Sequence, residues 1–192
     1  MPSALTTEYN ELGLASYGGS LYLAWVGQSS PYHIWYSAFN GTSWTSQATI
    51  PGGEAAGYFP TGPALADFGG NLFASWATPV GTNEYSLDYS EFDGISWFGP
   101  TNLPFGSDDV HSGPTLAVQG GDLYWAWQPF GSSTPTGIEY ADTNGISWSG
   151  SSDIPASVGV NAYGPALAAY GGSLFAAWLV NVPATIYYAS GP

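Results

Sequence analysis

A short pattern of apolar and polar positions recurs four times along the chain. It reads Gly-Gly, a polar residue, Leu, an aromatic residue, any residue, a small residue and Trp, and its four copies end at Trp25, Trp76, Trp127 and Trp178. Successive tryptophans are 51 residues apart. A fixed period of this kind is the sequence signature of a repeat architecture, so the chain is interpreted unit by unit.

The pattern predicts a strand that is covered on both faces. Its Leu and Trp fall on one face of a strand, while the aromatic and small residues fall on the other, because successive side chains alternate. Apolar residues on both faces are typical of sheets stacked face to face. In each unit another apolar run precedes the Gly-Gly pair, at 13–16, 63–67, 114–118 and 165–169, and Gly-Gly between two such runs predicts a hairpin turn.

Two further strands complete the predicted unit. After a variable loop, an apolar-x-Tyr run predicts a third strand; an Asn-Gly or Asp-Gly turn then leads to a fourth strand that carries Trp44, Trp97 or Trp148. Four short strands per repeat predict a propeller blade. We therefore expect an all-β fold, a β-propeller of four blades of about 51 residues, as a single domain over 1–192 with units at approximately 10–60, 61–111, 112–162 and 163–192.

The fourth unit lacks the counterpart of residues 146–153, which form the outer strand of the third unit. The N-terminal residues align with the linker that follows an outer strand, so they do not supply it. We expect the last blade to lack its outer strand and to leave Thr185–Ala189 as an open edge. Exposed edges invite pairing with another chain, so we expect a homo-oligomer, either a ring of eight blades from two chains or a larger array.

Composition excludes several kinds of partner. The chain has no Lys or Arg against 14 Asp and Glu, so binding to nucleic acid or to an anionic membrane surface is not expected. No apolar run is long enough for membrane insertion. No signal peptide is visible, yet the absence of trypsin sites suits an extracellular protein. No cofactor is expected, and no metal site either, because Asp108 and Asp109 near His111 are more typical of a solvated linker.

The hairpins also carry a family resemblance. The runs from Ser37 to Trp44 and from Ser90 to Trp97 resemble the Asp-box hairpin of sialidase-type propellers, although Phe39 and Phe92 stand where an Asp box has its Asp. The whole unit resembles the blades of bacterial multi-bladed propeller lectins of the fucose-binding type, which implies a propeller that binds carbohydrate. Sialidase activity is not expected, because a sialidase holds its substrate carboxylate with arginines and this chain has none.

The resulting hypothesis is a secreted lectin that recognises neutral sugars at repeated inter-blade sites and is not an enzyme, because no carboxylate recurs in every unit. Aromatic rings can stack on sugar faces while polar groups bind hydroxyls. The candidate glycan-binding residues are Trp44, Trp97, Trp148, Tyr36, Tyr89, Tyr140, Trp35, Asp88 and Glu139. Packing within the blades is the alternative role for the outer tryptophans. The alternative functions are a self-assembling structural subunit of a filament or coat, and a catalytic propeller.

Overall fold

The computed structural model of the chain describes residues 12–28, 31–55, 61–81, 84–104, 113–129, 137–157, 162–181 and 184–191. Within these ranges the regular elements are strands and one 3-10 turn, η1 (Pro155–Ser157). No helix in the described part has the length and hydropathy needed to cross a membrane.

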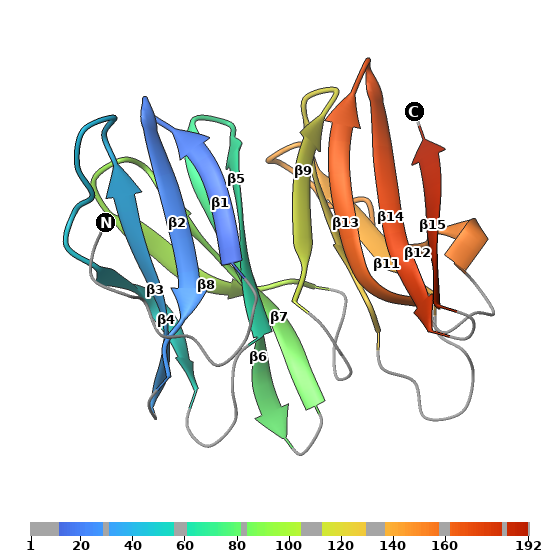
Figure 1. Ribbon diagram of the computed structural model, residues 1–192, viewed down its shortest axis with the longest axis horizontal. Helices are drawn as coiled ribbons and strands as arrows, with labels where there is room; N and C mark the ends of the chain where they lie inside the picture. The colour runs from blue at the N-terminus through green and yellow to red at the C-terminus, as the bar shows by residue number, and fades with distance from the viewer. Residues whose placement is uncertain are drawn as a thin grey trace.

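The strands form four antiparallel sheets, which we call blades 1 to 4 in chain order (Figure 1). Blade 1 contains β1 (Leu12–Tyr17), β2 (Ser20–Val26), β3 (Tyr32–Phe39) and β4 (Ala48–Ala55), and blade 2 contains β5 (Thr61–Phe68), β6 (Asn71–Gly81), β7 (Glu84–Phe92) and β8 (Trp97–Asn102). Blade 3 contains β9 (Thr115–Gln119), β10 (Asp122–Trp127), β11 (Glu139–Thr143) and β12 (Ser152–Asp153). Blade 4 contains only β13 (Ala162–Tyr170), β14 (Ser173–Asn181) and β15 (Ala184–Gly191). The predicted all-β propeller with a three-stranded last blade is confirmed.

The two kinds of turn in each blade follow from their residues. Both glycines of each Gly-Gly pair have positive φ, as at Gly18 (54°) and Gly19 (78°), which a tight hairpin needs and glycine allows without strain. In the second turn, Asn40 Oδ1 accepts hydrogen bonds from the backbone N–H groups of Thr42 and Ser43, both at 2.9 Å. Asp93 and Asn144 accept the equivalent pairs. These residues therefore hold the turns in shape.

The core lies between neighbouring blades. Three apolar clusters join blade 1 to blade 2, blade 2 to blade 3, and blade 3 to blade 4. Each cluster packs the Leu-Trp face of one blade on the aromatic-small face of the blade before it. Trp76 and Trp127 are fully buried, Trp178 is 2% exposed and Trp25 is 3% exposed. These four tryptophans are therefore core residues.

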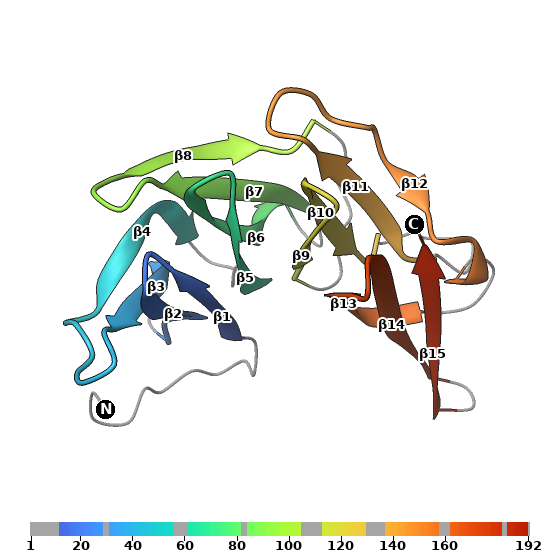
Figure 2. The ribbon, with the colours of Figure 1, turned by 90° about the horizontal axis from the view of Figure 1, so that it is seen from above.

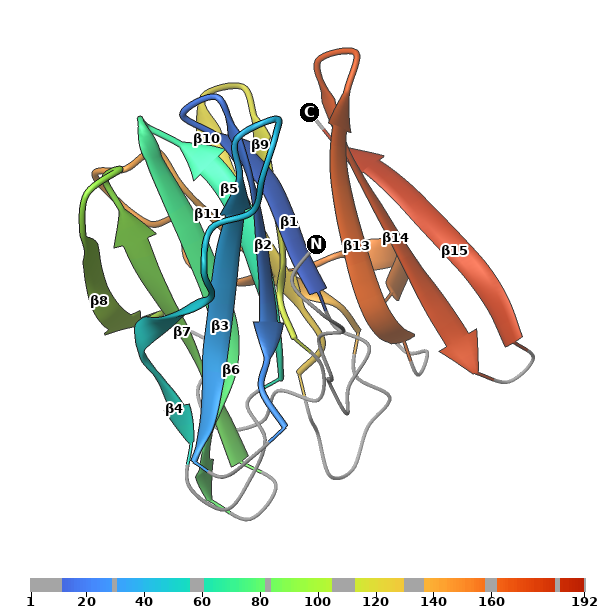
Figure 3. The same ribbon diagram turned by 60° about the vertical axis from the view of Figure 1, so that its left-hand side comes forward.

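The blades follow an arc, and the ring does not close. Figure 2 shows the arc from above, and Figure 3 shows β1 and β13 on opposite sides of the opening. In the described part of the chain, no core cluster contains residues of both blade 1 and blade 4. Each of these two blades therefore has one face without a neighbouring blade.

Candidate functional site

Two carboxyl groups face each other on the outer strands of blade 3. Glu139 on β11 is the register partner of Asp153 on β12. Side chains directly opposite on antiparallel strands have Cβ atoms about 4.5–5.5 Å apart. Glu139 is half-buried, and its pKa is raised by desolvation and further by the nearby Asp153 carboxylate. Asp153 is exposed, so the two groups have different surroundings.

Buried polar contacts hold the backbone on either side of this pair. Ser157 Oγ accepts a hydrogen bond from the Ile138 N–H at 2.7 Å and lies 2.7 Å from the Ile154 carbonyl oxygen, to which it donates. Ile154 N–H also donates to the Ile138 carbonyl at 2.8 Å. Ile138 precedes Glu139, and Ile154 follows Asp153. The turn at η1 therefore positions both strands of the carboxyl pair.

The same position in blade 2 has different chemistry. Asp88 is the register partner of Asn102, whose amide donates to Asp88 Oδ1 at 3.2 Å. Ser86 donates to the other carboxylate oxygen at 3.4 Å. Asp88 thus faces an amide where Glu139 faces a second carboxyl group. Among the described strands, only blade 3 has two carboxyl groups opposite each other at this position.

A cavity of about 240 Å³ lies between blades 3 and 4. Its lining includes Tyr124, Tyr140, Asp142 and Leu167. Tyr124 is the register partner of Asp142, and its pKa is raised by burial, then by the charges of Asp142 and Asp122. Carboxylate and phenol groups therefore gather at this cavity.

A second cavity, of about 330 Å³, lies between blades 2 and 3 at the equivalent place. Its lining includes Asn71, Tyr89, Glu91 and Trp148. Asn71 donates to Glu91 Oε2 at 3.1 Å, and the pKa of Tyr89 is raised by burial and then by Glu91. The two cavities are repeats of one inter-blade groove with different polar residues.

The structure separates the nine predicted site residues into two groups. The Tyr of one blade meets the outer-strand Trp of the next: Tyr36 lies 5.4 Å from Trp97, and Tyr89 lies 6.1 Å from Trp148, between ring centroids. Trp44 instead packs on Phe39 of its own blade, at 5.3 Å. All three tryptophans are half-buried.

The remaining predicted residues fall elsewhere. Trp35, Asp88 and Glu139 each precede a predicted Tyr in the strand, so they point to the opposite face of their sheet. Tyr140 lines the cavity between blades 3 and 4, where blade 4 has no outer strand to supply a Trp. The nine residues therefore do not form a single kind of site.

Sequence reasoning missed Asp153, Asp122, Asp142 and Glu91. A signal for Asp153 does exist, because Thr49, Asn102 and Asp153 all stand five residues after an outer-strand Trp. Aligning the repeats would have paired Asp153 with Glu139. The described residues contain no group of three or more His, Cys, Asp or Glu side chains that could hold a metal ion. Asp108, Asp109 and His111 lie outside the described residues.

No known protein family and no curated protein matches this chain. Several solved structures have a similar fold. The arabinanase Arb43A of Bacillus subtilis is 15% identical with a TM-score of 0.56, and the match covers 95% of this chain and 73% of that one. A family 117 glycoside hydrolase from Zobellia galactanivorans is 13% identical with a TM-score of 0.66, covering 95% and 69%. The GH43_1 enzyme of Xanthomonas citri, complexed with xylose, is 11% identical with a TM-score of 0.59, covering 94% and 69%.

These neighbours correct the functional interpretation. The resemblance to propeller lectins and sialidases holds only for the propeller fold, because the similar structures are an arabinanase and other glycoside hydrolases of families 43 and 117. The hypothesis of a lectin, or of a purely structural subunit, is therefore wrong, and so is the expectation that the chain is not an enzyme. A carboxyl pair can lie within one blade, as Glu139 and Asp153 do, so the absence of a carboxylate that recurs in every blade does not exclude an enzyme.

Proposed function

We propose that this chain is a glycoside hydrolase that uses Glu139 as proton donor and Asp153 as its carboxylate partner. The observation that carries this proposal is the raised pKa of Glu139 directly opposite an exposed Asp. Glycosidases pair a protonated acid with an ionised carboxylate about 5–10 Å away. Two carboxyl groups with different surroundings can divide these roles. The likeness of the fold to glycoside hydrolases supports the same reaction class.

In this mechanism, Glu139 keeps its proton at a pH where an ordinary glutamate has lost it, and gives it to the leaving glycosidic oxygen. Asp153 lies on the exposed side and supplies the partner carboxylate. It acts either as the nucleophile or as the base that activates water, depending on the separation of the two carboxyl groups in the substrate complex. Ser157 holds the two strands in register, so the separation is set before substrate binds.

The substrate is a neutral glycan. The chain has no Lys or Arg to pair with a carboxylate or sulfate group, so acidic glycans lose the charge-assisted contacts that usually bind them. Neutral plant and algal polysaccharides occur outside cells, and we propose an extracellular place of action. The same absence of basic residues leaves no trypsin cleavage site.

The test is release of reducing sugars from a panel of neutral polysaccharides, namely arabinan, arabinoxylan and xyloglucan. Glu139→Gln should lower kcat/KM by about 100- to 10,000-fold, the usual contribution of a general acid. Asp153→Asn should cause a loss of similar size. Activity of the unmodified protein should fall as the pH rises through the raised pKa of Glu139.

Asp67→Asn is the matched control, because Asp67 is exposed on β5 and is not part of the pair. It should retain full activity. No activity on any glycan of the panel would contradict the proposed function. Activity that survives both Glu139→Gln and Asp153→Asn but is lost in Asp142→Asn would instead place the reaction at the cavity between blades 3 and 4.

A further inference from the structure

The outer face of blade 4 is apolar and uncovered. Tyr170 is 80% exposed, Ile186 76% and Tyr188 78%, and Phe175 and Leu179 are also exposed on this face. No Asp, Glu, Lys or Arg occurs between 162 and 191, although the whole chain has a net charge of −14. A contiguous exposed apolar face of this kind marks an interaction surface.

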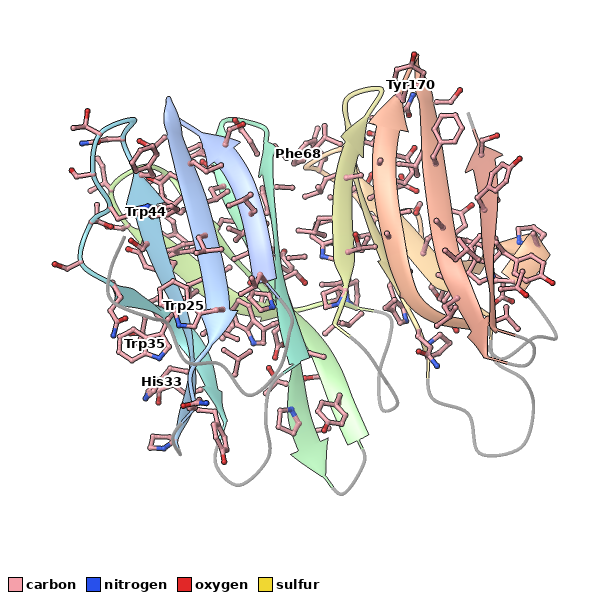
Figure 4. All side chains as sticks on the ribbon, viewed as in Figure 1. Trp25, His33, Trp35, Trp44, Phe68 and Tyr170 are labelled. Atoms are coloured by element: carbon pink, nitrogen blue, oxygen red, sulfur yellow. The ribbon has the colours of Figure 1, made fainter. Side chains whose placement is uncertain are left out.

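In blade 2 the same repeat positions are buried by the following blade. Phe68, the counterpart of Tyr170, is 8% exposed, and Leu87, the counterpart of Ile186, is fully buried. Both belong to the cluster that includes Leu123 and Trp125 of blade 3. Figure 4 shows the contrast between Phe68, which lies between two blades, and Tyr170 at the free tip of blade 4. Blade 4 therefore presents a docking face prepared for another Leu-Trp face.

At the other end of the arc, no blade in the described part of the chain packs on the Leu-Trp face of blade 1. Leu12 and Leu14 are both 58% exposed on this face, next to their register partners Trp25 and Leu23. Their repeat counterparts in blade 2, Pro63 and Leu65, are buried. The two halves of one blade-to-blade interface are thus both present in the chain. On blade 1 the exposed part of this face is Leu12 and Leu14, whereas Trp25 is 3% exposed.

Two hydrogen bonds between neighbouring blades support the idea that blade 1 of one chain fits on blade 4 of another. Tyr17 OH donates to the carbonyl of Gly70 in the next blade at 3.0 Å, and Gln119 Nε2 donates to the carbonyl of Gly172 at 2.6 Å. Tyr170 is the repeat counterpart of these two donors, and Gly19 is the counterpart of the two acceptors. Tyr170 is 80% exposed, so it is free to make the equivalent contact with another blade.

We propose that a second copy of this chain binds head to tail, with its blade 1 on the free face of blade 4. The Leu12 and Leu14 side of one copy covers Tyr170, Ile186 and Tyr188 of the other, and the Tyr170 hydroxyl donates to the Gly19 carbonyl of the second copy. This contact is heterologous, because it joins two different faces, and it continues until a ring closes or a longer array forms. Lack of charge on blade 4 lets two strongly acidic chains approach there.

The experiment is sedimentation velocity of the 192-residue chain across a dilution series. Unmodified protein should form species of at least twice 20.0 kDa, and more of them at high salt, which screens the net charge. Ile186→Asp and Leu14→Asp should each weaken association at least about tenfold, because a charge is buried without a partner. Tyr170→Phe should weaken it up to about tenfold through loss of one hydrogen bond. Ile146→Asp is the matched control, since Ile146 is 93% exposed on a turn outside both faces.

Mixing the two face variants separates this arrangement from a symmetric one. The intact blade 1 of Ile186→Asp can still bind the intact blade 4 of Leu14→Asp. At a concentration where each variant alone is monomeric, the mixture should therefore give a one-to-one dimer. A mixture that stays monomeric would overturn the head-to-tail contact. Unmodified protein that remains at 20.0 kDa throughout would overturn self-association and indicate that another propeller blade or another protein covers the faces.

Discussion

At the scale of single residues, the fold acts in opposite directions on two carboxyl groups. Desolvation, reinforced by Asp153, raises the pKa of Glu139. The backbone N–H groups of Ser96 and Ile95 lower the pKa of Asp93, which stands in a surface turn. Asn40 and Asn144 perform the same hydrogen bonding without a charge. Acidic residues of similar appearance in the sequence therefore have different roles.

We predict that Glu139→Gln stabilises the protein at neutral pH. A raised folded-state pKa means that the native protein holds this proton more tightly than the unfolded chain does, so ionisation of Glu139 favours unfolding. Stability should decline as the pH rises from the unfolded pKa of about 4.3 through the raised folded value, and the variant should lack this decline. Urea denaturation between pH 4 and pH 8 measures it. A variant less stable than the unmodified protein at pH 7 would contradict the prediction.

We predict that Asp93→Asn changes the pH dependence of stability in the opposite direction to Glu139→Gln. Because the folded-state pKa of Asp93 is lowered, its carboxylate stabilises the fold above the unfolded pKa, and this stabilisation is lost as the pH falls. Asparagine retains both hydrogen bonds, as Asn40 and Asn144 do, so the variant should lose only the pH dependence.

At the scale of elements, buried hydrogen bonds tie the two outer strands of blade 3 together. In blade 3, Ser157 in η1 is fully buried and is hydrogen-bonded to Ile138, just before β11, and to Ile154, just after β12. The β12 strand has only two residues, Ser152 and Asp153. Pairing between β11 and β12 alone therefore contributes little to holding Asp153 opposite Glu139. The hydrogen bonds of the buried Ser157 also hold the two strands in this register.

We predict that Ser157→Ala lowers the free energy of unfolding by about 1–3 kcal/mol, because the buried N–H of Ile138 loses its acceptor. The loss of register should also lower kcat more than it changes KM, and broaden the pH profile of activity. Ser151→Ala, at an exposed position of the same blade, is the control and should change stability by less than about 0.5 kcal/mol. Equal effects of the two variants would contradict a positioning role for Ser157.

At the scale of the whole molecule, 14 Asp and Glu residues have no Lys or Arg to offset them. Compact folding brings like charges together, and mutual repulsion raises the pKa of carboxyl groups. Blade 4 carries none of these charges, so the repulsion acts on the other three blades. The uneven distribution leaves the free end of the arc neutral.

We predict that the melting temperature rises as the pH falls from 8 to 5 at low salt, and that added salt raises it at pH 8 by screening repulsion. Differential scanning calorimetry at several ionic strengths measures both effects. The monomeric variant Ile186→Asp should be compared in the same way, because salt-dependent association would otherwise contribute to the result. A melting temperature that falls steadily toward pH 5 would refute the prediction.

The sequence alone determined the blade, because its signals are local. Gly18-Gly19 and the equivalent glycine pairs indicate tight turns. Apolar residues on both alternating faces around Trp76 and Trp127 indicate a strand covered on both sides. The missing counterpart of 146–153 shortens the last blade. Only the tertiary structure decided what meets between strands and blades. The pairing of Glu139 with Asp153 depends on the register of a two-residue strand held by Ser157, and the exposure of Tyr170 depends on an arc that leaves blade 4 without a neighbour. Such contacts join residues that are distant in the chain, and their geometry follows from the packing of whole blades.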